Sequence, residues 1–202
     1  MRKALVILAV IAFAGIATAQ DLIITEIMYK DANDGGDWVE LYNAGTTPID
    51  LAGMHMVDGD PGLPHDSHPH VMLAGILNPG EILVVVADFT EFGAVYPGVT
   101  NLNVNAFDPA GEGFGLGGSG DTIFLLGAAD EVVYEMTYDD SEPWPTEPDG
   151  DGPSLLLVTN DCADYSSDIC WMAGVDGGTP GVLTTTVANE EASWSQVKNL
   201  FR

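Results

Sequence analysis

A run of histidines and aspartates carries the side chains whose types and spacing could do chemistry. It reads DGDPGLPHDSHPH and contains His65, His68 and His70, with Asp58 and Asp60 just upstream. Imidazole and carboxylate together suit zinc or another transition metal, and a catalytic zinc site uses three protein ligands and one open position. The H-x-x-H-x-H spacing lacks the helical i, i+4 geometry of zinc protease motifs, so nothing in it positions a general base. We therefore treat these five residues as candidate metal ligands and not as a catalytic centre.

Three acidic turns form a second set of candidate ligands, for calcium. Each places oxygen-bearing side chains at alternate positions beside glycine, which is how a loop wraps a hard cation. None supplies the bidentate glutamate at the twelfth position of an EF-hand, and Asp-Gly pairs are also common turn formers. Calcium is therefore a candidate stabiliser and not a catalyst. The turns are residues 31–34, the pair Asp58 and Asp60, and the pair Asp149 and Asp151.

Other catalytic patterns find no match in the sequence. There is no G-x-S-x-G elbow, and no serine or cysteine stands in a recognisable nucleophile context. Glu26 and Glu40 lie on neighbouring predicted strands and invite an acid/base interpretation, but glycosidase carboxylates need a cleft that this pattern does not indicate. We expect both glutamates at polar positions on the outer face of a hairpin, and we predict that the protein is not an enzyme.

Short strands are the elements that must position these residues. Residues 22–29 and 38–43 are apolar runs separated by an Asp, Asn and Gly turn, which predicts a pair of strands. Residues 82–87 are apolar on both faces, as in a central sandwich strand. Residues 88–120 show no sustained periodicity and predict a long loop pinned by its aromatic side chains. Further strands are expected at residues 54–57, 71–73, 122–126, 132–138 and 154–158, with Trp171 on or beside a final edge strand.

A series of short motifs runs through residues 21–182. They are TEIMY from Thr25, DWVELYN from Asp37, PIDLAG from Pro48, NPGEILV from Asn78, GDTIFL from Gly120, WP from Trp144, DGDGPSL from Asp149 and GTPG from Gly178. Together these motifs resemble the lamin tail domain family in its secreted bacterial form. The resemblance implies an all-β, immunoglobulin-like β-sandwich, here of about eight or nine strands, and it carries over no catalytic residues.

The chain is strongly acidic. Its 202 residues include 31 Asp and Glu against 5 Lys and Arg, a formal net charge of −26. If Arg2 and Lys3 leave with a leader, three bases remain and the charge becomes 3 − 31 = −28. Nucleic acid is not an expected partner, because phosphate binding relies on Lys and Arg.

The two ends of the chain differ from its middle. Arg2 and Lys3 precede an apolar run, and Ala17-Thr18-Ala19 has the small-x-small pattern of a leader cleavage site. We therefore predict a secreted or cell-surface protein with no membrane-spanning segment once the leader is removed. The predicted divisions are a signal peptide at 1–19, a lamin-tail-like domain at 20–182, a polar linker at 183–192, and a C-terminal tail at 193–202 that is either a sorting or anchoring signal or a frayed end.

The two cysteines, Cys162 and Cys170, are close together near the end of the predicted domain. An even cysteine count in an exported chain predicts a disulfide between them. A loop this short contributes about 2–3 kcal/mol in the chain-entropy model, so the bridge staples a local segment.

These expectations combine into a non-catalytic exported or cell-surface interaction or structural module. Its partner is expected to be a protein or a polysaccharide of the cell surface. Two alternatives remain open, a metal-dependent hydrolase using His65, His68 and His70, and a calcium-dependent glycan-binding module. The hydrolase requires the three imidazoles to converge on one pocket. The glycan-binding module requires aromatic side chains beside an acidic loop.

Overall fold

The computed structural model describes residues 21–185 of the chain. The predicted signal peptide, the predicted C-terminal tail and residues 186–192 of the predicted linker lie outside this part. Within residues 21–185, no helix combines the length and the apolar character that crossing a bilayer requires.

The described chain forms twelve β-strands, one α-helix and two short 3-10 helices. Eight of these strands have five or more residues and the other four have two, so the expected eight or nine corresponds to the longer strands. In chain order the elements are β1 (Leu22–Met28), β2 (Trp38–Asn43), β3 (Ile49–Asp50), β4 (His55–Asp60), β5 (Leu63–Pro64), β6 (Val71–Met72), β7 (Ile76–Leu77), β8 (Ile82–Val86), α1 (Phe89–Val95), η1 (Pro109–Gly111), β9 (Asp121–Leu126), β10 (Val132–Tyr138), β11 (Pro153–Leu157), η2 (Asp168–Cys170) and β12 (Trp171–Asp176).

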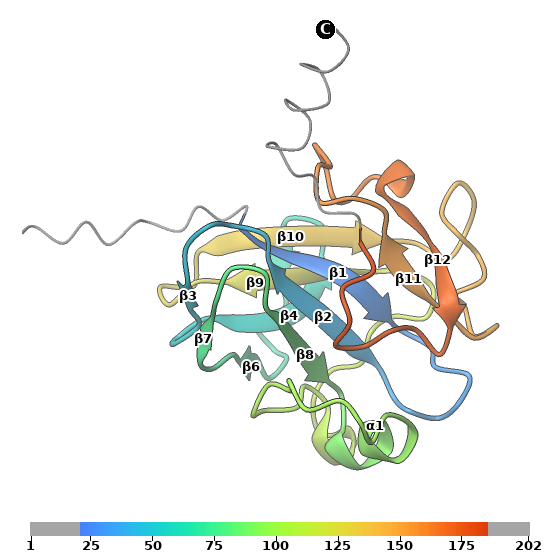
Figure 1. The fold of residues 1–202 in the computed structure, drawn as a ribbon, viewed down its shortest axis with the longest axis horizontal. Helices are drawn as coiled ribbons and strands as arrows, with labels where there is room; N and C mark the ends of the chain where they lie inside the picture. The colour runs from blue at the N-terminus through green and yellow to red at the C-terminus, as the bar shows by residue number, and fades with distance from the viewer. Residues whose placement is uncertain (1–20, 186–202) are drawn as a thin grey trace, which may run out of the picture.

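Two antiparallel sheets pack against each other, as Figure 1 shows. The first sheet has the order β12-β11-β1-β2-β8. The second has the order β10-β9-β4-β5, and β6 also pairs with β4, while β3 and β7 form a small separate ladder. This arrangement confirms the predicted immunoglobulin-like β-sandwich.

The core lies between the sheets and is built from alternate residues of their strands. Val39 and Leu41 of β2 and Ile123 and Leu125 of β9 are all fully buried in one apolar cluster. Because strand side chains alternate between two faces, each pair comes from one face of its strand. Burying one such side chain contributes about 1.5–3 kcal/mol, so this layer is the main source of stability.

The outer face of the first sheet is also covered, in part by α1. Trp38 and Phe92 are both fully buried in a second cluster between β2, β8 and this helix. Asp88 caps the helix, because its carboxylate accepts hydrogen bonds from the backbone N–H groups of Thr90 and Glu91. The prediction of an unbroken loop over residues 88–120 is therefore wrong at α1. The Asp88-x-x-Glu91 spacing is a helix-start signal that would have located it.

Strand β8 is buried as predicted but is not central. It ends the first sheet, and residues 101–107 bond to its outer edge instead of a further strand. The Val84 N–H donates to the Asn101 carbonyl at 2.9 Å, and the Asn103 N–H donates to the Val84 carbonyl at 2.8 Å. Strand β8 is apolar on both faces because α1 and residues 101–107 cover it.

A disulfide joins Cys162 to Cys170 just before β12. The closed loop packs on the body of the domain, because the indole N–H of buried Trp171 donates to the Tyr165 carbonyl at 2.7 Å. The Tyr165 ring lies 5.5 Å from that of Tyr134 on β10. Trp171 begins the edge strand β12, as the sequence predicted.

Candidate functional site

Strands β4 and β5 form a hairpin that brings Asp58 opposite His65. Gly59 pairs with Pro64, and the His65 N–H donates to the Asp58 carbonyl at 3.0 Å. A side chain at position 59 would lie 2.5 Å from the Leu63 carbonyl, so the close approach requires glycine. The sequence predicted a loop here because of its Pro and Gly content, and this is wrong for its first half. Proline is compatible with an edge strand such as β5.

A turn then returns His68 to the same carboxylate. Its N–H donates to the His65 carbonyl at 3.4 Å, and its Nδ1 lies 2.6 Å from Asp58 Oδ1. The His65 and His68 rings are 4.6 Å apart between centroids. Asp58, His65 and His68 each offer one ligand atom within 4.8 Å of the others. The structure therefore brings together three of the five predicted ligands of this run.

The centre combines a buried carboxylate with accessible imidazoles. The Asp58 side chain is 9% exposed, and that of His68 is 38% exposed. A second carboxylate, Asp121, is near enough for its charge to interact with Asp58 and His65. Burial raises the pKa of Asp121, hydrogen bonds from the backbone of Gly117 and Thr122 lower it, the Asp58 charge raises it and His65 lowers it.

Asp121 was not found from the sequence. It lies beside Asp58 because β4 pairs with β9, with Asp58 opposite Ile123, and residues two apart on a strand share a face. No local pattern in the sequence indicates that β4 pairs with β9.

His70 and Asp60 do not join the centre. His70 stacks on His55, with the ring centroids 4.8 Å apart. His55 and Asp58 are three positions apart on β4, so their side chains lie on opposite faces. Asp60 is at the exposed end of the strand.

His55 and His70 line an open pocket of about 320 Å³. The Nε2 atom of His55 lies 3.2 Å from Asp130 Oδ1, which is short enough for an ion pair, but the two atoms do not have hydrogen-bond geometry. The other pocket residues are Gly53, Met72, Ala128 and Asp130.

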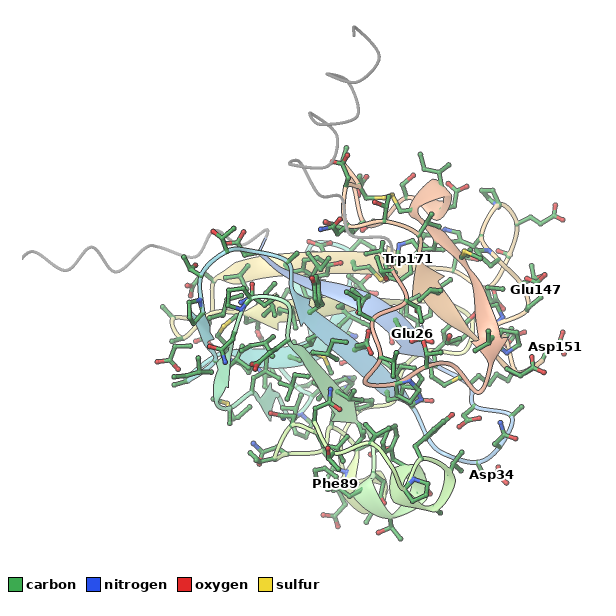
Figure 2. All side chains as sticks on the ribbon, viewed as in Figure 1. Glu26, Asp34, Phe89, Glu147, Asp151 and Trp171 are labelled. Carbon is green, nitrogen blue, oxygen red and sulfur yellow. A yellow bond between two sulfur atoms is a disulfide. The ribbon has the colours of Figure 1, made fainter. Side chains whose placement is uncertain are left out.

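The acidic turns proposed for calcium have protein partners. Asp149 Oδ1 accepts from Lys30 Nζ at 2.6 Å, and Asp151 is exposed. The Asp31 carboxylate accepts from the Asn33 N–H at 2.8 Å and from the Tyr96 hydroxyl at 2.8 Å. Figure 2 shows Asp34 and Asp151 at the rim of the molecule.

Glu26 and Glu40 are buried, which contradicts their expected place on a polar outer face. Each is 1% exposed, and they are direct partners across β1 and β2. Residues 177–185, which we term the C-terminal strap, supply hydrogen bonds to both. Thr179 donates its N–H to Glu26 Oε1 at 2.9 Å and its hydroxyl to Oε2 at 2.7 Å, and the Gly181 N–H donates to Glu40 Oε2 at 2.9 Å. Figure 2 shows Glu26 well inside the outline of the molecule.

Two further hydroxyls complete this carboxylate pair. Thr25 donates to Glu40 Oε1 at 2.6 Å, and Ser154 of β11 donates to Glu26 Oε1. Burial raises the pKa of both glutamates against the effect of these hydrogen bonds, and it raises that of Glu40 to about 7 with a contribution from the Glu26 charge. Burial likewise raises the pKa of Asp37 to about 7.

Comparison with known families decides what kind of domain this is. The model of the Lamin Tail Domain family matches residues 16–140, which is more than half of the chain. The chain belongs to the lamin tail domain family. A search of curated proteins gives no significant match. The lamin tail match covers the two hairpins β1–β2 and β9–β10, whereas β11, β12 and the C-terminal strap lie beyond it.

Membership of this family confirms the resemblance drawn from the motifs. Lamin tail domains are immunoglobulin-like, non-enzymatic domains that serve as protein-interaction modules. The Trp144, Asp149 and Gly178 motifs lie outside the matched residues.

The raised pKa of Glu40 predicts a pH-dependent stability. Its folded value of about 7 exceeds the ordinary value of 4.5, so the unfolded state loses the proton first as pH rises. The unfolding free energy should therefore fall between about pH 4.5 and 7 and level off above. Glu40→Gln should reduce this fall by up to about 1.4 kcal/mol per pH unit, measured by urea unfolding over that range.

Glu147→Gln is the matched control, because it removes an exposed glutamate. Glu26 and Asp37 should leave a residual slope in the Glu40 variant. Parallel pH profiles for the wild type and Glu40→Gln would contradict this interpretation.

Proposed function

We propose that this lamin tail domain protein is an exported, non-catalytic interaction or structural module that acts at the cell surface or outside the cell. The observation that carries the proposal is the family match over residues 16–140. A domain family of this kind contributes binding or structure, although fold alone does not determine function.

The Glu26–Glu40 pair supports a non-catalytic role. Two facing carboxylates with raised pKa values are the kind of pair that acid/base catalysis uses. Here every carboxylate oxygen accepts a hydrogen bond from Thr25, Ser154 or the C-terminal strap. The hydrogen bonds of this pair therefore hold the strap to β1 and β2.

The placement of the histidines argues against the hydrolase alternative. That mechanism was expected to use His65, His68 and His70 around one ion, and His70 instead stacks on His55. The glycan-binding alternative needs an exposed aromatic beside an acidic turn, and the Tyr96 hydroxyl beside Asp31 is engaged in hydrogen bonds.

The charge of the chain favours a protein or polysaccharide partner over nucleic acid. Lys30 is the one Lys or Arg within residues 21–185, and Asp149 pairs with it. A surface with so little basic charge gives phosphate groups almost nothing to bind.

Export is supported by the leader pattern and by the disulfide. Disulfides persist in oxidising compartments, and Cys162 and Cys170 are bonded. When the full chain is expressed in a bacterium, the protein should leave the cytoplasm and begin at Gln20, with both cysteines protected from alkylation. Cell fractionation, intact mass and thiol labelling measure these three properties.

Leu8→Asp is the control, because a charge in the apolar run of a leader should block export. Full-length cytoplasmic protein with free thiols in the wild type would overturn the export proposal. Zinc-dependent hydrolysis that is lost in a His65→Ala, His68→Ala variant would overturn the non-catalytic part.

Calcium enters the proposal as a stabiliser of the Asp149–Asp151 turn. An ion there must displace the Lys30 ammonium, so Lys30→Gln should increase any calcium-dependent rise in melting temperature. Asp149→Ala with Asp151→Ala should abolish the rise, measured by thermal melts in EDTA and in calcium at constant ionic strength. An unchanged rise in that double variant would exclude this turn.

A further inference from the structure

We propose that Asp58, His65 and His68 form a binding site for a divalent transition-metal ion of the zinc type. The site lies on the β4–β5 hairpin, away from the strap and the Glu26–Glu40 pair. It goes beyond the proposed module function, because it assigns a ligand to side chains that neither the sandwich core nor the strap uses.

The donor atoms are close to the spacing that such an ion needs. Zinc bonds to nitrogen and oxygen of about 2.0–2.2 Å place tetrahedral ligand atoms about 3.4 Å apart. One ligand atom from each of the three residues lies within 4.8 Å of the others, and His68 Nδ1 is 2.6 Å from Asp58 Oδ1. His65 and His68 are half-buried, so small rotations of their rings can bring all three atoms to one ion.

The hairpin holds the donors in place before any ion binds. The His65 N–H bonds to the Asp58 carbonyl, and the His68 N–H bonds to the His65 carbonyl. The carboxylate of Asp58 also orients the His68 ring through the 2.6 Å contact.

The local charge provides an independent reason for a cation. Asp58 is buried, Asp121 is near enough to interact with it, and a buried carboxylate is costly unless its charge is compensated. Lys30, the one Lys or Arg of residues 21–185, is held by Asp149. A divalent ion supplies a positive charge that no Lys or Arg of residues 21–185 provides here.

The mixture of donors selects the class of metal. Two imidazoles and one carboxylate suit zinc, cobalt, nickel or copper, whereas calcium and magnesium prefer oxygen ligands alone. Three protein ligands leave a fourth position for water. The partial exposure of His65 and His68 gives the ion access from solvent.

Titration of the purified, EDTA-treated and dialysed protein with Zn²⁺ and with Co²⁺ tests the site. Calorimetry should show one ion per chain, and Co²⁺ should give the visible absorption of a four-coordinate site. At a hundredfold excess over Kd, Zn²⁺ should raise the melting temperature by roughly 5–10 °C. His65→Asn and His68→Asn should each abolish the tight binding and the shift.

His70→Asn is the matched control, because it removes an imidazole from the same run without touching the centre. It should bind Zn²⁺ as the wild type does. The proposal is overturned if the wild type shows no saturable binding, if the His65 and His68 variants bind equally well, or if His70→Asn loses binding to the same extent. Circular dichroism of each variant shows that it is folded, and the half-buried positions of His65 and His68 make that the expected result.

Discussion

The structure depends on two facing carboxylates that are buried and must be satisfied. Glu26 and Glu40 are directly opposite each other on β1 and β2, where their charges repel and no lysine or arginine of residues 21–185 pairs with them. Burying such groups is costly unless hydrogen bonds compensate for the lost water. The C-terminal strap supplies these bonds through Thr179 and Gly181, which are 153 and 141 positions away along the chain. The first hairpin and the end of the domain therefore stabilise each other.

The close fit of the strap follows from the same constraint. Gly178 has φ of +67°, and a Cβ there would lie 2.7 Å from the Trp38 ring. Only glycine combines that backbone conformation with so close an approach. The lamin tail match ends at residue 140, so the carboxylates within the matched part are completed by Ser154 of β11 and by the strap beyond it.

A shortage of basic side chains shapes the rest of the molecule. The described chain compensates buried acidic groups with hydroxyls, backbone N–H groups and histidine, as at Asp37, where the Leu116 N–H donates to the carboxylate. At Asp58 the compensation comes from His68. An external cation would therefore stabilise the Asp58 centre more than the Glu26–Glu40 pair. The carboxylate oxygens of that pair already accept hydrogen bonds from the protein.

Much of the sandwich was predictable, because apolar and polar residues that alternate along a short segment indicate a strand. The pairs β1–β2 and β9–β10, the edge position of Trp171 and the Cys162–Cys170 bridge follow from patterns within short windows. The burial of a strand's outer face by a segment distant in the sequence was not predictable. Alternation assigns Glu26 and Glu40 to one face of a hairpin but does not show that a strap buries that face.

The metal centre shows the same division. The types of residue and their spacing pointed to Asp58, His65 and His68, and the register of the β4–β5 hairpin decides which donors meet. His70 was included with them from its spacing alone, and the alternation of β4 places its partner His55 on the other face. Asp121 comes from a strand more than fifty residues later, so a local pattern could not reveal it.

Native-state amide hydrogen exchange tests most directly whether the strap and the carboxylate pair form one unit. The N–H groups of Thr179 and Gly181 should exchange as slowly as those of β1 and β2, and Glu40→Gln should accelerate the exchange at Gly181. Exchange at Thr179 and Gly181 as fast as in an exposed loop, while β1 and β2 remain protected, would show that the strap does not hold the carboxylates and would contradict the account.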